Sequence, residues 1–316
     1  MANLGQALVG LLSVAIVAAG PARATEAEST GNVKAPSDTI GELTVTAPNT
    51  PDRLIDETTQ FVRNHVPENR AGQLSRFRDK ICVNVVGLPA AYDAFIVQRV
   101  VKLASQVNAP IDHSGKCTPN VNVIFSPDPQ AQLEDIAKRR QILLGFQWVA
   151  QMRRLASFEQ PIQSWYLTRS VGTDGQSVLE LNHGSTFMDV AENIAGAVTG
   201  RAGSRLGTDQ SSELVHTLIL VDANKVADAQ IGSIADYIAV LALSRWQSLN
   251  TCEAIPTILN LMADNCDAVS TPETTTNADI ALLAGLYALN PRDLGAQQRA
   301  TIASAIRKAS KAQPQH

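Results

Sequence analysis

The strongest pattern of apolar and polar positions lies between residues 213 and 250. Residues 214–221 are apolar except for His216 and Thr217, and a short run of this kind predicts a buried strand. After a polar connection, residues 234–243 are apolar nearly all round, which is typical of a helix with neighbours on several sides. We therefore expect a central helix that follows a buried strand.

The start of this helix is predicted from a capping-box pattern. Ser233 is followed three residues later by Asp236, so a serine oxygen and a carboxylate can each accept a backbone N–H of the first turn. The helix is predicted to open at Gly232–Ser233, and Asp236 is interpreted as a cap rather than a catalytic acid. On this hypothesis Asp236→Asn lowers the stability by about 1 kcal/mol or less.

Upstream, the pattern alternates between strand and helix. Residues 81–86 and 121–125 are predicted to be strands on either side of a helix over 90–107. Such a unit most often joins parallel neighbours through a right-handed crossover. The other patterns before residue 210 are helical at 52–64, around Leu74 and Phe77, at 128–144 and at 148–158, and strand-like at 164–167 and 177–181, which we expect to pair around Gly172–Gly175.

Beyond residue 250 the pattern is helical only. A short helix with Pro256 in its first turn is predicted between Cys252 and Cys266. Thr276–Asn277 are expected to cap a helix over 278–288, and a last helix is predicted over 296–309. The predicted fold class is α+β: one domain over 51–316, with a mixed sheet packed on a central helix and a helical C-terminal extension from about residue 251.

The first 24 residues differ from the rest of the chain. Ala7 to Ala19 is a run of small apolar residues, and Ala22-Arg23-Ala24 fits the small-x-small pattern that precedes signal-peptidase cleavage. The run is shorter than the roughly 20 residues that span a bilayer. We therefore expect a signal peptide over 1–24, cleavage after Ala24 and no transmembrane segment thereafter. Residues 25–50, rich in Thr, Ser, Glu and Pro, are interpreted as a flexible leader.

Export makes the four cysteines informative, because disulfides form and persist in oxidising compartments. They fall into two couples that are each local in sequence, Cys82 with Cys117 and Cys252 with Cys266. Four cysteines allow three connectivities, and we expect the local one. Loops of these lengths contribute roughly 3 to 4 kcal/mol each in the chain-entropy model. The predicted location is periplasmic or secreted.

Composition narrows the range of partners. The formal net charge is -4 and only 4% of the residues are aromatic, so neither a basic face nor a stacking platform for nucleic acid is expected. The basic stretch with Arg70, Arg76, Arg78 and Lys80 is interpreted as a solvated face. Nucleic acid is therefore excluded as a partner, whereas an unknown protein or small molecule is not.

Motifs for the common chemistries are missing from the sequence. The five histidines lack the spacing of a zinc site, and there is no G-x-S-x-G or S-x-x-K serine motif and no phosphate loop. The segment from Asp222 to Asp228 has the alternating oxygens of a calcium loop, but Ala227 and Ser233 stand where glycine and glutamate are needed. No cofactor or metal is predicted.

Three stretches carry a family resemblance. Residues 78–88, 117–125 and 278–287 resemble an uncharacterised family of exported bacterial proteins, which implies no activity. The order of elements is similar to that of zincin metallopeptidases, but the central helix has Asp236-Tyr237-Ile238-Ala239-Val240 in place of H-E-x-x-H, which implies an inactive scaffold. Glu42–Pro48 resembles the TonB-contacting segment of outer-membrane receptors and implies a TonB contact; otherwise it is an edge strand or linker.

These observations favour a non-catalytic binding or interaction protein over an enzyme. The alternative is a hydrolase whose site is assembled from distant residues, and the candidate polar set is His183, His216, Glu213 and Asp222. The two hypotheses differ in structure. A cleft in which a histidine contacts a carboxylate favours the enzyme, whereas a shallow apolar groove favours binding.

Overall fold

The computed structural model describes residues 51–69, 72–145, 155–172, 175–180, 210–267 and 271–312. The predicted signal peptide, the leader with Glu42–Pro48, most of the helix predicted over 148–158 and His183 lie outside the described residues. The strands are β1 (Arg76–Phe77), β2 (Val83–Val86), β3 (Val121–Ser126), β4 (Ile162–Gly172), β5 (Ser177–Glu180) and β6 (Gln210–Asp222). The helices are α1 (Pro51–His65), α2 (Ala90–Gln106), α3 (Pro129–Arg139), α6 (Ile231–Leu243), α7 (Asn277–Tyr287) and α8 (Gly295–Ala312), with short 3₁₀ helices η1 (Gln141–Leu144) and η2 (Ile258–Met262).

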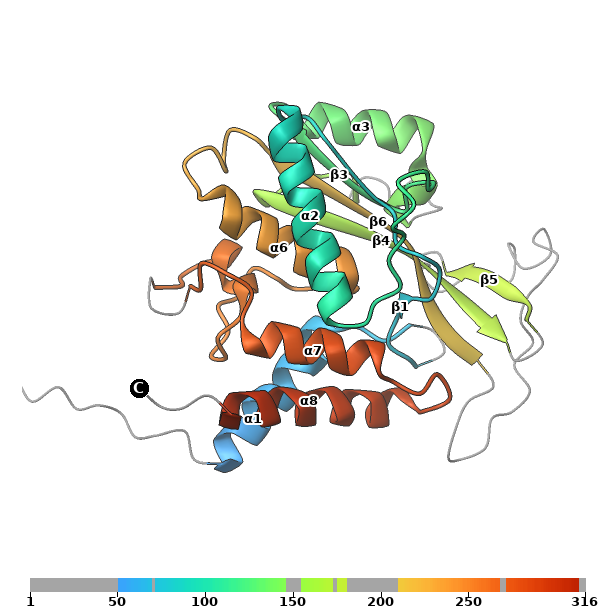
Figure 1. The fold of residues 1–316 in the computed structure, drawn as a ribbon, viewed down its shortest axis with the longest axis vertical. Helices are drawn as coiled ribbons and strands as arrows, with labels where there is room; N and C mark the ends of the chain where they lie inside the picture. Colours follow the sequence, from blue (N-terminus) through green and yellow to red (C-terminus); the bar gives the residue numbers. More distant parts are fainter. Residues whose placement is uncertain are drawn as a thin grey trace, which may run out of the picture. The chain divides into compact units, whose positions relative to one another are not determined.

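The strands form one mixed sheet in the order β2-β3-β6-β4-β5. β2 and β3 run parallel to each other, as predicted for two strands joined by the crossover helix α2, and β3 runs parallel to β6. β4 runs antiparallel to β6, and β5 antiparallel to β4. The fold is therefore α+β, with the buried strand β6 in the middle of the sheet (Figure 1).

Side chains alternate along β6 between two hydrophobic cores. Ile219 and Val221 belong to the larger core, which also contains α2 and α6. Leu218 and Leu220 belong to a smaller core with Leu133 of α3. Because successive side chains of a strand point to opposite faces, a strand covered on both faces is apolar throughout, and this explains the unbroken run in the sequence.

The central helix α6 begins at Ile231 and is buried from Ser233 to Leu243. The predicted capping box is wrong, because the N-cap is Gln230 and no side chain caps this helix. Asp236, only 5% exposed, instead forms an ion pair with Arg99 of α2 at 3.2 Å and accepts the N–H of Thr275 at 3.1 Å. The apolar surroundings draw Asp236 to partners on neighbouring elements rather than to its own helix start.

We expect Asp236→Asn to lower the free energy of unfolding by about 2 kcal/mol, more than a cap would contribute, because it removes the charge that pairs with Arg99 in a buried setting. Asp228→Asn is the control, since Asp228 is exposed in the segment before α6 and should change stability by less than about 0.5 kcal/mol. Urea unfolding of the two variants measures both effects. Equal midpoints would show that the ion pair contributes nothing.

The segment around Leu74 and Phe77 is a strand, not the predicted helix. Arg76–Phe77 pair in parallel with Glu213–Leu214 at the start of β6. They lie on the same side of β6 as β3, which pairs with its later residues, whereas β4 pairs with the other side. Arg76 is buried and donates to the carbonyl of Leu289, so it does not belong to a solvated face. Burial, and then Arg78, lower the pKa of Arg76 to about 10, so that it keeps its charge at neutral pH. Long-range pairing therefore overrides the local pattern.

The C-terminal part is helical, as predicted from about residue 251, and α7 opens with a capping box. Thr276 accepts the N–H of Asp279, and Asp279 accepts the N–H of Thr276. The same carboxylate accepts the hydroxyl of Thr257 and the N–H of Ile258, which ties α7 to the start of η2. α7 and α8 lie side by side, and α1 packs on α8 (Figure 1).

Both pairs of cysteines form disulfides. Cys82 is joined to Cys117 and Cys252 to Cys266, with Cα–Cα distances of 5.9 and 5.3 Å, which is the local connectivity expected from the sequence. The two bonds indicate an oxidising, extracytoplasmic environment. Within the described part of the chain, no helix is both long and apolar enough to cross a membrane.

Candidate functional site

An apolar pocket of about 380 Å³ opens where β3 and β6 end and α2 and α6 begin. Its walls come from the turn after β2 (Leu88 and Pro89), the end of β3 (Phe125) and the segment entering α6 (Val226 and Ile231). The volume falls within the range of about 300 to 1,000 Å³ that is usual for small-molecule sites. The crevice outside the carboxyl ends of parallel strands is also where open α/β sheets bind their ligands.

The turn between β2 and α2 depends on Gly87. Its φ is +106°, a backbone conformation that residues other than glycine rarely adopt. A Cβ at this position would lie 2.1 Å from the carbonyl oxygen of Phe125. The absence of a side chain therefore lets the turn lie directly against the end of β3. This close approach fixes the wall formed by Leu88 and Pro89.

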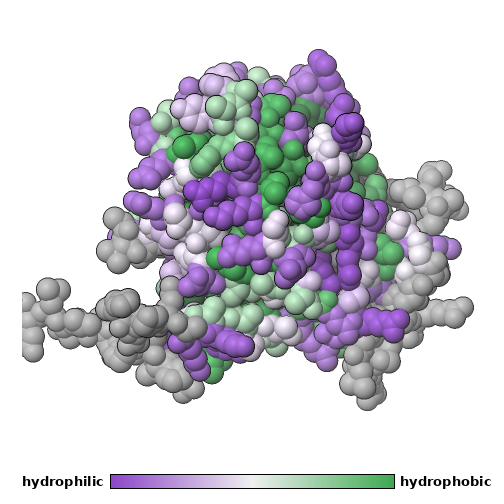
Figure 2. Space-filling view, in the orientation of Figure 1, coloured by the Kyte–Doolittle hydropathy of each residue, from purple (hydrophilic) through white to green (hydrophobic). Residues whose placement is uncertain are grey.

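Apolar side chains continue onto the surface beside the pocket. Tyr92, in the first turn of α2, lines the pocket and is 50% exposed, and Val86 at the end of β2 is 41% exposed. Apolar surface gathers over the upper end of α2 in Figure 2, where this helix begins. Neither α2 nor α6 has a side-chain cap at its start. The side chains that line the pocket are apolar, apart from the hydroxyl of Tyr92.

A second pocket, of about 410 Å³, lies at the start of α7 and is polar. Two of its threonines already have partners within the protein: the N–H of Thr275 bonds Asp236, and Thr276 and Asp279 cap each other. These groups are satisfied by the fold itself. The apolar pocket is therefore the better candidate site.

The predicted polar set does not converge on a catalytic site. Glu213 binds Arg169 at 2.8 Å, and Asp222 accepts the N–H groups of Asn224 and Lys225 in the turn that follows β6. His216 lies on β6 as well, and six residues of strand separate it from Asp222 by about 20 Å. His183 lies outside the described residues. Within the described residues, His216 therefore contacts neither Glu213 nor Asp222, and the hydrolase alternative stays a prediction.

His216 instead ends a row of polar side chains that crosses the sheet. The amide nitrogen of Asn84 donates to Asn122 at 3.3 Å, and the amide nitrogen of Asn122 donates to Nε2 of His216 at 2.8 Å. Burial, and then the guanidinium of Arg140, lower the pKa of His216 to about 4. The imidazole is therefore neutral at pH 7 and carries its proton on Nδ1.

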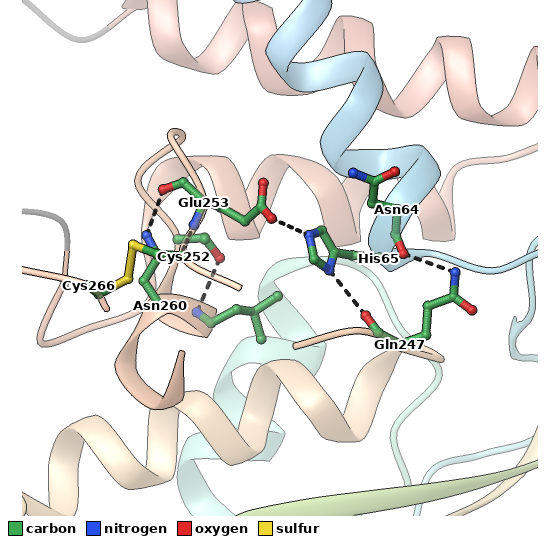
Figure 3. A network of polar contacts seen from close by, with 9 residues as sticks. Asn64, His65, Gln247, Cys252, Glu253, Asn260 and Cys266 are labelled. Carbon is green, nitrogen blue, oxygen red and sulfur yellow. Dashed lines mark hydrogen bonds and ion pairs between the residues drawn. A yellow bond between two sulfur atoms is a disulfide. The ribbon is translucent and has the colours of Figure 1, made fainter. Parts of the chain in front are cut away.

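A different histidine does contact a carboxylate (Figure 3). Nε2 of His65, at the end of α1, lies 2.7 Å from Oε1 of Glu253, and Nδ1 lies 3.1 Å from the carbonyl of Gln247. The sequence separates these groups by 188 positions, and no local pattern could have paired them. The side chain of His65 is only 3% exposed and that of Glu253 is 19% exposed, so most of the contact is shielded from solvent.

The surroundings of the His65–Glu253 pair are structural. The backbone N–H of Glu253 bonds the side-chain oxygen of Asn260, and the amide of Asn260 returns to the carbonyl of Glu253. Glu253 also follows Cys252, which is held by its disulfide to Cys266. The network therefore fixes α1 to the C-terminal part rather than presenting an acid and a base to a substrate.

No family model, curated protein sequence or solved structure matches this chain. The resemblances to an uncharacterised exported family and to zincins therefore stay predictions. Among the described residues, no three His, Cys, Asp or Glu side chains come close enough together to hold a metal ion.

Proposed function

We propose that this chain is an exported, periplasmic or secreted binding protein, and that its ligand is a small apolar molecule held in the pocket between the starts of α2 and α6. The observation that carries the proposal is the pocket itself, because its lining side chains are apolar and include no carboxylate, histidine, lysine or arginine. A shallow apolar groove is also the structural feature that the sequence analysis expects of a binding protein rather than an enzyme.

The rigidity of the walls supports the same function. Phe125 and Ile234 belong to the larger core, so one side of the pocket is continuous with the best-packed part of the protein. The close approach of Gly87 to Phe125 fixes the wall formed by Leu88 and Pro89. A preformed pocket of this kind binds without the entropic cost of ordering its walls.

The test uses the neutral fluorescent probe 1-N-phenylnaphthylamine with the disulfide-bonded protein. We expect saturable binding with enhanced emission, and at least about tenfold weaker binding by Ala223→Phe, because the larger side chain fills a half-buried lining position. Ala94→Phe is the matched control, since Ala94 is exposed on α2 outside the pocket, and it should bind as the wild type does. Equal loss in both variants, or no saturable binding by folded wild type, would refute the proposal.

A further inference from the structure

The polar pocket at the start of α7 is formed by three separate parts of the chain. α7 and α8 lie side by side, and the start of α7 lies near the end of α8 (Figure 1). Thr274 before α7, Ser310 near the end of α8 and Pro256 of the segment that the Cys252–Cys266 disulfide closes all line it. Its volume of about 410 Å³ is usual for a small-molecule site, and it shares no lining residue with the apolar pocket.

Hydrogen bonds to the rest of the protein hold the walls of this polar pocket. The backbone N–H of Thr275 bonds the buried carboxylate of Asp236 at 3.1 Å. The hydroxyl of Thr276 donates to the carbonyl of Pro256 at 2.9 Å, and Thr276 also forms the capping box of α7 with Asp279. The segment before α7 is therefore fixed in place, and a ligand can bind without the entropic cost of ordering these walls.

The polar side chains that line this pocket are neutral, and most of their hydrogen-bonding capacity is unused. The hydroxyls of Thr274 and Thr275 and the side-chain amide of Asn277 have no hydrogen-bond partner among the described residues. A hydroxyl and an amide can each donate and accept. None of the lining side chains carries a charge. The pocket therefore suits a ligand that offers both donors and acceptors and is itself uncharged.

We propose that this pocket binds a neutral sugar, whose hydroxyls exchange hydrogen bonds with Thr274, Thr275 and Asn277. Each hydroxyl of a pyranose ring both donates and accepts, as the lining groups do. Pro256 and Pro272 offer apolar surface to the C–H groups of the ring. A carboxylate or phosphate would lack a cationic partner among the lining side chains, and an ammonium would lack a carboxylate. The site is independent of the apolar pocket, so either proposal can fail alone.

The experiment follows the backbone amides of Thr274 and Thr275 and the side-chain amide of Asn277 in ¹H–¹⁵N spectra of the disulfide-bonded protein at pH 7. D-Glucose, D-galactose and N-acetyl-D-glucosamine are titrated separately, with sodium D-glucuronate as the charged comparison at constant ionic strength. We expect saturable shifts of these resonances with at least one neutral sugar and none with glucuronate. No saturable shift with any of the three neutral sugars, or an equal response to glucuronate, would overturn the proposal.

Two pocket variants and one control make the result specific. Thr275→Val removes a hydroxyl but keeps the backbone N–H that bonds Asp236, and Asn277→Ala removes the side-chain amide. Each should raise the midpoint of the titration about tenfold, because a hydroxyl of the bound sugar then lacks its partner. Thr301→Val is the matched control, since Thr301 is exposed on α8 and does not line the pocket, and it should leave the midpoint unchanged. Wild-type midpoints in both pocket variants would show that the sugar binds elsewhere and would refute the assignment.

Discussion

Gly87→Ala is expected to lower the free energy of unfolding by about 4 kcal/mol. The substitution combines a strained backbone at φ +106° with a Cβ placed 2.1 Å from the Phe125 carbonyl oxygen. Each effect costs about 1 to 3 kcal/mol in other proteins, and neither can relax cheaply, because the obstructing atom belongs to the backbone of a sheet strand. Urea unfolding monitored by circular dichroism measures the loss.

Gly115→Ala is the matched control for Gly87→Ala. Gly115 also has a positive φ, +66°, but a Cβ there would meet nothing within 4 Å, so only the conformational cost of about 1 kcal/mol remains. The difference between the two variants isolates the close approach to Phe125. If both lose the same stability, the contact between the turn and β3 is looser than described. Gly87→Ala should also weaken probe binding, because Leu88 and Pro89 must move.

The second large effect concerns pH. Burial and Arg140 hold the pKa of His216 at about 4, against 6.5 for an ordinary histidine. Above pH 6.5 the ring is neutral in both folded and unfolded protein, so it does not affect stability. Between pH 6.5 and about 4 the unfolded chain takes up a proton that the folded protein does not, and the free energy of unfolding should fall by roughly 3 kcal/mol before levelling off.

This pH dependence can be assigned by comparing two histidine substitutions. His216→Gln has no ionisable group and should show a stability profile that is shallower by roughly 3 kcal/mol between pH 6.5 and 4. His113→Gln removes an exposed histidine from the loop before β3 and serves as the control. Denaturant titrations at half-unit pH intervals give the three profiles. Parallel profiles for wild type and His216→Gln would mean that the ring is protonated in the folded protein.

The sequence predicts most elements, because their causes are local. The alternating pattern of 81–125 identifies β2, α2 and β3, and the apolar run before Asp222 identifies β6. Thr276 lies where the pattern of α7 begins, and the structure forms the cap there. The position of each of these elements follows from side chains within a few residues, which periodicity and capping rules describe well.

The errors and omissions involve partners that are distant in sequence. Arg76 belongs to a strand because its backbone pairs with Glu213 and its side chain with Leu289, and neither partner is visible in the pattern around Phe77. Asp236 follows a serine at capping distance, yet its carboxylate binds Arg99 and the N–H of Thr275 instead of the start of its own helix. The apolar pocket likewise combines segments from Leu88 to Ile234, each of which resembles ordinary core in isolation.

The packing of α1 on α8 affects how the chain can fold as it is made. Phe61 and Val62 of α1 share a core with Ile302 and Ile306 of α8, and Arg307 donates to Thr58 at 3.4 Å. A chain that is synthesised from its N-terminus releases α1 long before α8. The first helix therefore keeps its apolar face uncovered until residue 312 has emerged, and a product interrupted before α8 presents that face to chaperones and proteases.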